Sequence, residues 1–159
     1  MDITWIQPYY HIILGYIPET PKTILDVGAG YGIFGYIIKK TRNTQLTAIE
    51  PFYDDLPHDL VFKMTWKEWY EKHKTHYDVL IATEMIEHLP EDEALLFLKQ
   101  AKETADVVVI ATPLKFEEQK AYDNNEYQKH LCAVSKEQFM EEGYSIFLYN
   151  DSIIASWKK

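Results

Sequence analysis

The chain has 159 residues, of which 47% are apolar, so its length and composition fit one folded domain with a real core and exclude a disordered chain. Sixteen basic residues against 25 acidic ones give a net charge of −9, with Arg42 as the single arginine, which argues against broad binding to nucleic-acid backbones. The single Cys132 excludes an internal disulfide, and no run approaches the roughly 20 apolar residues of a membrane span, so we expect a soluble, cytoplasmic protein.

The first half of the chain alternates short apolar runs with helical patterns. We expect a helix over roughly residues 3–17, within a cap or lid segment at 1–20. TILDV at 23–27 ends at a glycine and predicts a buried strand. Apolar residues recur at helical spacing from 31 to 40, and QLTAIE at 45–50 predicts the next strand, which a proline ends. The segment 51–59 holds two prolines and is too short for a normal crossover helix.

The second half shows the same alternation more clearly. Strands are predicted at 60–64, 77–83 and 105–112, and helices at 63–76, with buried indoles and a solvated lysine face, and at 91–103. A polar loop spans 115–132. Ser135 and Gln138 form a capping box for a helix that ends near Gly143. The runs 144–149 and 152–157 flank Asn150-Asp151, which is typical of a hairpin turn.

These elements predict one architecture. Strands that alternate with helices favour a three-layer α/β fold with a mostly parallel, seven-stranded sheet. The terminal hairpin adds an antiparallel end. We therefore expect a single domain over residues 1–159.

A glycine loop, LDVGAGYGIFG, follows the first predicted strand and opens the first long helix. Gly30, Gly32 and Gly35 satisfy the dinucleotide fingerprint GxGxxG, whereas Asp26 with Gly28, Gly30 and Gly32 satisfies DxGxGxG. Glu50 lies 20 residues beyond Gly30 and suits either pattern, because a carboxylate can bind both ribose hydroxyls. Both patterns predict a nucleotide-bearing cofactor at this loop.

ILDVGAGYG and LTAIEPF resemble the first two motifs of the class I S-adenosylmethionine-dependent methyltransferases. YDVLIATEMIEHLPE, ATPLKF and KHLCAVSKEQFMEEGY resemble later segments of that family, so the resemblance spans residue 22 to about 145. It implies a Rossmann-like methyltransferase fold, S-adenosyl-L-methionine as cofactor, a glycine loop around its methionine part and Glu50 on its ribose. The implied cofactor-binding residues are Asp26, Gly28, Ala29, Gly30, Gly32, Glu50, Pro51, Phe52, Thr65, Trp66 and Thr83.

The chain departs from the family pattern after the third strand. Family members commonly place an acidic residue there against the adenine, but this sequence reads KMTWKEW. Thr65 and Trp66 would have to replace that acid, by hydrogen bonding and by stacking.

EMIEHLP at 84–90 holds the candidate catalytic group, and three interpretations stay open. If residues 84–88 form one helical turn, Glu84, Glu87 and His88 share a face and can bind Mg²⁺, Mn²⁺ or Zn²⁺. This E-x-x-E-H sequence resembles that of the quinone-biosynthesis O-methyltransferases and small-RNA 2′-O-methyltransferases, which implies His130 as a further ligand. In the second interpretation, His88 and the two glutamates, Glu84 and Glu87, act as base and positioners without metal. The candidate catalytic residues are His88, Glu84 and His130. In the third, Glu87 and His88 only cap and orient a helix.

The sequence favours an O-methyltransferase that acts on a small molecule. RNA-end or other nucleic-acid methylation is the alternative, as is a non-catalytic cofactor-binding module on the same fold. Residues 83–86, TEMI, lack the Asp/Asn-Pro-Pro-aromatic motif used on exocyclic amines of DNA bases, and an NAD-dependent oxidoreductase would need a second domain. A homodimer could supply cover for the substrate.

Overall fold

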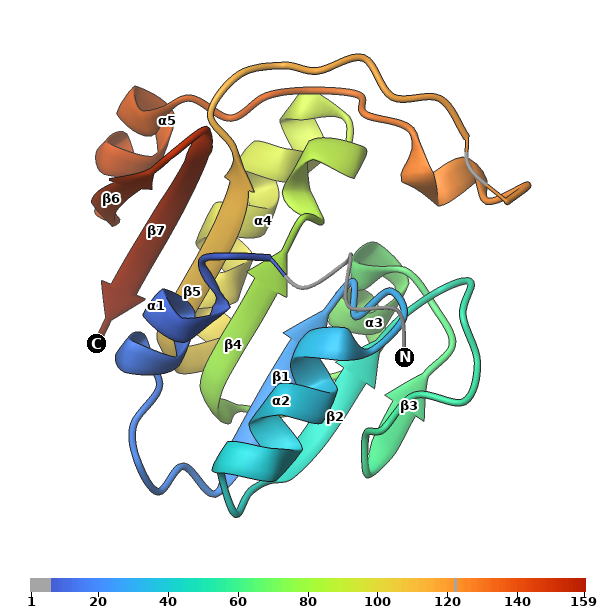
Figure 1. Cartoon of the computed structure of the whole chain (residues 1–159), viewed down its shortest axis with the longest axis vertical. Coiled ribbons are helices and arrows are strands. Elements are labelled where there is room, and N and C mark those ends of the chain that lie inside the picture. The colour runs from blue at the N-terminus through green and yellow to red at the C-terminus, as the bar shows by residue number, and fades with distance from the viewer. Residues whose placement is uncertain (1–6, 122) are drawn as a thin grey trace.

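The computed structural model describes residues 7–121 and 123–159, and its centre is a seven-stranded sheet in the order β3-β2-β1-β4-β5-β7-β6 (Figure 1). The strands are β1 (Thr23–Val27), β2 (Gln45–Ile49), β3 (Leu60–Phe62), β4 (Tyr77–Thr83), β5 (Ala105–Pro113), β6 (Ser145–Tyr149) and β7 (Ser152–Lys158). Neighbouring strands among β1 to β5 are parallel, whereas β7 is antiparallel to β5 and β6. The predicted sheet and hairpin are confirmed.

Five α-helices of the described residues cover the two faces of this sheet: α1 (Tyr10–Tyr16), α2 (Ile33–Thr41), α3 (Trp66–Lys72), α4 (Glu91–Thr104) and α5 (Lys136–Glu141). α1 and α2 share one buried apolar cluster with alternate residues of β4 and β5, and the other three helices share a second cluster. The predicted three layers are therefore present, with the sheet between two cores (Figure 1).

Several boundaries differ from the sequence prediction, and two of the differences have a local reason. The long helix begins at Ile33 rather than 31, because Gly32 stands before it in the left-handed conformation with φ 73°. The third strand ends at Phe62, because Thr65 already caps α3. The opening helix, predicted over 3–17, spans 10–16 where the structure describes it, and residues 3–6 lie outside the described residues.

The parallel strands bring their carboxyl ends to one edge of the sheet. The segments after β1, β2 and β4 begin there with Gly28, Glu50 and Glu84, and β5 ends there at Pro113. Open α/β sheets bind ligands at such an edge. Within the described residues, no helix has the length and apolar character needed to cross a bilayer.

Candidate active site

A cavity of about 470 Å³ lies at this edge, between the glycine loop and the long loop that follows β5. Twelve of the predicted site residues line it: Gly28, Ala29, Gly30, Glu50, Pro51, Thr65, Trp66, Thr83, Glu84, Glu87, His88 and His130. The other three predicted residues, Asp26, Gly32 and Phe52, are not among the lining residues that the structure describes. The fold thus gathers into one cavity residues that are up to about 100 positions apart in the chain.

Gly28 begins the glycine loop in a conformation that a side chain would not tolerate. Its φ is 70°, and a Cβ built there would lie 2.3 Å from Cγ of Met85. Met85 is buried and lines the cavity next to Glu84. The absence of a side chain at Gly28 therefore lets the glycine loop approach the segment that carries Glu84 and Glu87.

Gly28→Ala is expected to destabilise the protein by about 1–3 kcal/mol, because it adds backbone strain and overpacks the contact with Met85. Gly15→Ala is the matched control: nothing lies within 4 Å of a Cβ at Gly15, which sits in α1. Alanine there is expected to be neutral or slightly stabilising. Urea unfolding of both variants measures the difference, and equal stabilities would contradict this account of Gly28.

Glu50 connects the end of β2 to the glycine loop. Its Oε2 accepts the N–H of Gly30 at 2.8 Å, and its Oε1 accepts the N–H groups of Phe52 at 2.8 Å and Tyr53 at 3.2 Å. Burial raises the pKa of Glu50, and these three backbone donors oppose the rise. The carboxylate is therefore held rigidly in the cavity wall, where each oxygen can accept a further hydroxyl.

Asp26 lies behind the glycine loop instead of in the cavity. The carboxyl group is 2% exposed and accepts a hydrogen bond from Nε2 of His58 at 3.0 Å. Gly32 lies against Pro57, and the ring of Phe52 is exposed. The three residues outside the cavity wall thus contact or belong to the segment that follows β2.

Thr65 and Trp66 have structural roles at the start of α3. The Thr65 hydroxyl accepts the N–H of Glu68 at 3.4 Å in a capping box. The Trp66 ring is 6% exposed, stacks on Trp69 and donates its Nε1–H to Gln100 at 2.7 Å. Because core side chains pack against the indole of Trp66, only a small part of the indole surface faces the cavity.

Glu84 stands outside any helix, so residues 84–88 do not form the single helical turn that the metal interpretation assumed. Its φ is 50°, a left-handed conformation that is uncommon for a residue with a side chain, and the 3-10 helix η2 (Ile86–His88) begins two residues later. The phenol of Tyr9 donates to Oε1 of Glu84. Burial raises the pKa of Glu84.

Glu87, His88 and His130 nevertheless converge, with one possible ligand atom from each lying within 4.8 Å of the others. Glu87 is buried; its Oε2 accepts the hydroxyl of Thr112 at 2.9 Å, and its Oε1 has no hydrogen-bond partner among the described residues. Burial and then the charge of Glu84 raise the pKa of Glu87 well above its usual range. A buried carboxyl oxygen without a partner is costly unless a cation or a proton joins it.

The two histidines present a defined tautomer. Nδ1 of His88 lies 3.0 Å from the carbonyl of Lys129, and Nδ1 of His130 lies 2.7 Å from the carbonyl of Glu117. Because a carbonyl oxygen can only accept, each Nδ1 carries a hydrogen, and in a neutral ring the lone pair is then on Nε2, where a ligand can use it. Burial lowers the pKa of His88, which favours the neutral ring that metals bind.

No side-chain hydrogen bond of the described residues supports the interpretation that Glu87 and His88 cap a helix. Neither η2 nor α4 has a side-chain hydrogen bond at its N-cap within the described residues. Sequence reasoning also missed Tyr9 and Thr112, the partners of the two glutamates. The position of Thr112 at the carboxyl end of β5 is a signal that could have placed it at this edge, whereas nothing in the sequence connects Tyr9 to Glu84.

A family model described as a methyltransferase domain matches residues 6–142. A search of curated proteins finds no significant match. Many solved structures share the fold at low sequence identity.

One is a 1,6-didemethyltoxoflavin N1-methyltransferase from Burkholderia thailandensis with bound substrate and S-adenosylhomocysteine: 12% identity, TM-score 0.74, covering 99% of this chain and 79% of that one. Another is a methyltransferase from Archaeoglobus fulgidus: 13% identity, TM-score 0.69, covering 94% and 90%. A cyclopropane synthase from Mycobacterium tuberculosis matches with 15% identity and a TM-score of 0.62; 87% of this chain spans 60% of that one. These likenesses confirm the Rossmann-like methyltransferase fold.

Proposed function

We propose a reaction for this chain on the premise that it belongs to the methyltransferase-domain family and is an S-adenosylmethionine-dependent methyltransferase. The proposed reaction is transfer of the methyl group to an oxygen atom of a small molecule, assisted by a divalent cation at Glu87, His88 and His130. The observation that carries the metal-assisted form is the convergence of these three side chains, one of which, Glu87, has a buried carboxyl oxygen without a hydrogen-bond partner among the described residues.

The residues at the glycine loop fit S-adenosylmethionine. Nothing lies within 4 Å of a Cβ built on Gly30, which leaves room for close approach of the ligand to the backbone, and Glu50 presents a fixed carboxylate for ribose hydroxyls. When bound, the cofactor supplies a methyl group on a positively charged sulfur. The acidic side chains that line the cavity suit that charge, and the chain contributes chiefly alignment and a shaped field.

The donor set at the other end of the cavity fits a divalent cation. One carboxylate oxygen and two imidazole nitrogens suit Zn²⁺ and Mn²⁺, and Glu84 lies beside them as a second carboxylate for Mg²⁺. A bound cation would hold an acceptor hydroxyl and lower its pKa. The carbonyls of Lys129 and Glu117 orient the two rings toward such a ligand.

Size and charge support a small acceptor. The cavity must hold both cofactor and acceptor within about 470 Å³. Glu50, Glu84, Glu87 and Glu117 line it, and Lys120 is the one lysine or arginine among its described lining residues. A phosphate-rich chain would meet repulsion here, so RNA is the less favoured acceptor.

Removal of metal is expected to abolish methyl transfer, and one of Mg²⁺, Mn²⁺ or Zn²⁺ should restore it. A panel of hydroxylated small molecules, thiols, amines and short RNAs with methyl-labelled cofactor would identify the acceptor, and the rate is then measured with and without EDTA. His130→Ala should weaken metal binding by about tenfold or more, whereas His76→Ala, on the exposed His76–Asp106 contact, should not. Full activity in EDTA would contradict the metal, and label on RNA alone would contradict the small acceptor.

A further inference from the structure

A short crossover loop, residues 51–59, replaces the helix that would normally follow β2, and it carries a buried histidine. The side chain of His58 is fully buried, and its Nε2 lies 3.0 Å from Oδ2 of Asp26, which is 2% exposed. Nδ1 of His58 is buried and has no hydrogen-bond partner among the described residues. Among the described residues, the hydrogen bond to Asp26 is therefore the one polar contact of the His58 ring.

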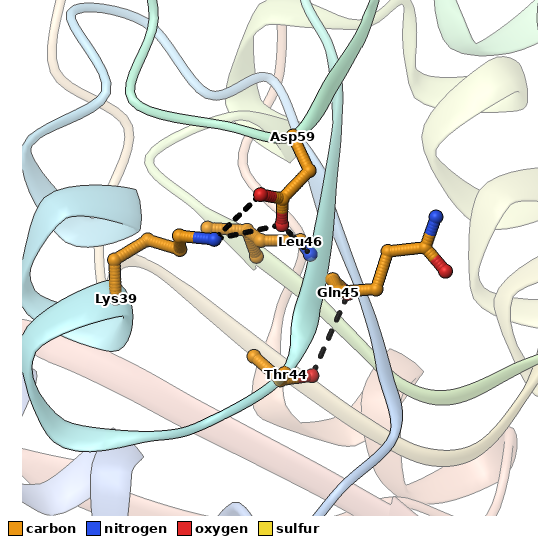
Figure 2. A network of polar contacts seen from close by, with 5 residues as sticks. All are labelled: Lys39, Thr44, Gln45, Leu46 and Asp59. Carbon is orange, nitrogen blue, oxygen red and sulfur yellow. Dashed lines mark hydrogen bonds and ion pairs between the residues drawn. The ribbon is translucent and has the colours of Figure 1, made fainter.

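Both ends of the crossover loop are anchored. Glu50 lies just before it and accepts the N–H groups of Phe52 and Tyr53. At the far end, Figure 2 shows Asp59 between Lys39 of α2 and the backbone of Leu46 in β2. Oδ1 of Asp59 lies 2.6 Å from Nζ of Lys39, and Oδ2 accepts the N–H of Leu46 at 2.8 Å. These contacts anchor both ends of the crossover loop and thereby hold His58 in place.

The crossover loop also contacts the glycine loop and the helix that follows. A Cβ built on Gly32 would lie 2.5 Å from Cδ of Pro57, and one built on Gly35 would lie 2.3 Å from Cε1 of His58. The imidazole thus lies directly against the first turn of α2 while it donates to Asp26 at the end of β1. His58 therefore contacts both ends of the segment 26–35.

We propose that His58 is a positioning residue for the cofactor loop. By donating Nε2–H to the Asp26 carboxylate and filling the space beside Gly35, it holds residues 26–35 in the conformation that receives the methionine part of S-adenosylmethionine. His58 is not a lining residue of the cavity, so it acts through Asp26 and the loop backbone rather than by touching the cofactor. This role rests on the proposed function, because it needs the cofactor at the glycine loop.

His58→Phe and His58→Gln separate the hydrogen bond from the bulk of the ring. Phenylalanine keeps a ring but cannot donate, whereas the amide of glutamine can place a donor near the position of Nε2. Loss of a hydrogen bond to a charged group predicts that His58→Phe raises the Kd of S-adenosylhomocysteine by about tenfold or more. His58→Gln should stay within about threefold of the wild-type Kd, and the KM of the methyl acceptor should change little in either variant.

Gly35→Ala tests the same contact without changing the histidine. Gly35 is helical and its φ is not positive, so alanine suits the backbone and acts only by displacing the imidazole. It should raise the Kd as His58→Phe does, with Gly15→Ala as the control that leaves the Kd unchanged. If His58→Phe fails to fold, Gly35→Ala and His58→Gln carry the comparison.

Calorimetry with S-adenosylhomocysteine, together with thermal melting of each variant, distinguishes the outcomes. Failure of the wild type to bind would contradict the proposed function itself. Binding by the wild type with an equal Kd in His58→Phe and Gly35→Ala would overturn only the positioning role. A lower melting temperature with an unchanged Kd would likewise overturn it, because His58 would then be a structural residue alone.

Discussion

Glu87→Gln is expected to lower methyl transfer by about 100-fold or more while the protein stays folded. Glutamine has the shape of glutamate, and its amide oxygen can still accept the hydroxyl of Thr112. What it lacks is the negative charge and the second acceptor oxygen that a cation would bind. Turnover and metal affinity should therefore fall together, measured by labelled methyl transfer and by metal titration.

The same substitution should change how stability depends on pH. Because the folded-state pKa of Glu87 is raised, its contribution to stability is fully present below the ordinary glutamate pKa and is lost as pH rises through the raised value. Glutamine stays neutral over that range. As pH rises above the ordinary glutamate pKa of about 4.3, the metal-free variant should thus lose less stability than the metal-free wild type, measured by urea unfolding.

Glu118→Gln is the matched control, because it makes the same chemical change at an exposed position of the loop after β5. It should keep wild-type turnover and a wild-type pH profile. Wild-type turnover in Glu87→Gln would contradict the role given to the carboxylate. If the stability of Glu87→Gln depended on pH as that of the wild type does, the raised pKa assigned to the buried Glu87 carboxyl group would be contradicted.

Glu50→Gln is expected to raise the Kd of S-adenosylhomocysteine by about 100-fold. The two oxygens of Glu50 face the N–H groups of Gly30 and Phe52, each at 2.8 Å. In glutamine one oxygen becomes an NH₂ group, which must meet one of these donors with a donor of its own. The glycine loop or the start of the crossover loop is then released, and an acceptor for ribose is lost.

Asp54→Asn removes a carboxylate from the same crossover loop and serves as the control. The side chain of Asp54 is 80% exposed and pairs with Lys63 at the surface, so its loss should leave the Kd unchanged. Calorimetry on the three proteins measures the comparison. A Glu50→Gln protein that binds as tightly as the wild type would show that the ribose is held elsewhere.

Local patterns predicted most of this fold. The strands at 23–27 and 77–83 and the capping box at Ser135 were all predicted where they occur, because strand burial and capping are set by residues close together in the chain. The hairpin at Asn150 follows from the same logic, since asparagine tolerates the left-handed turn that it adopts with φ 51°.

Local patterns failed where a contact spans distant parts of the chain. One of the three interpretations assumed a helical turn at Glu84, but its backbone is left-handed and its carboxylate accepts a hydrogen bond from Tyr9, 75 residues away. The cofactor role that the resemblance implies for Asp26 stays a prediction, and its buried carboxyl group contacts His58, 32 residues away. Neither partner has a sequence signal, because the pairing depends on which loops the sheet brings together.

The sequence by itself determined the order of strands and helices, the glycine loop with its acid at Glu50, and a group of acidic and histidine side chains after β4. Those features depend on periodicity, turn chemistry and spacing within short segments. Only the tertiary structure decided that Glu87, His88 and His130 meet, that Thr112 and two backbone carbonyls orient them, and that His58 stands behind the glycine loop. The physical reason is that parallel strands bring distant segments to one edge, where burial selects partners that no local pattern specifies.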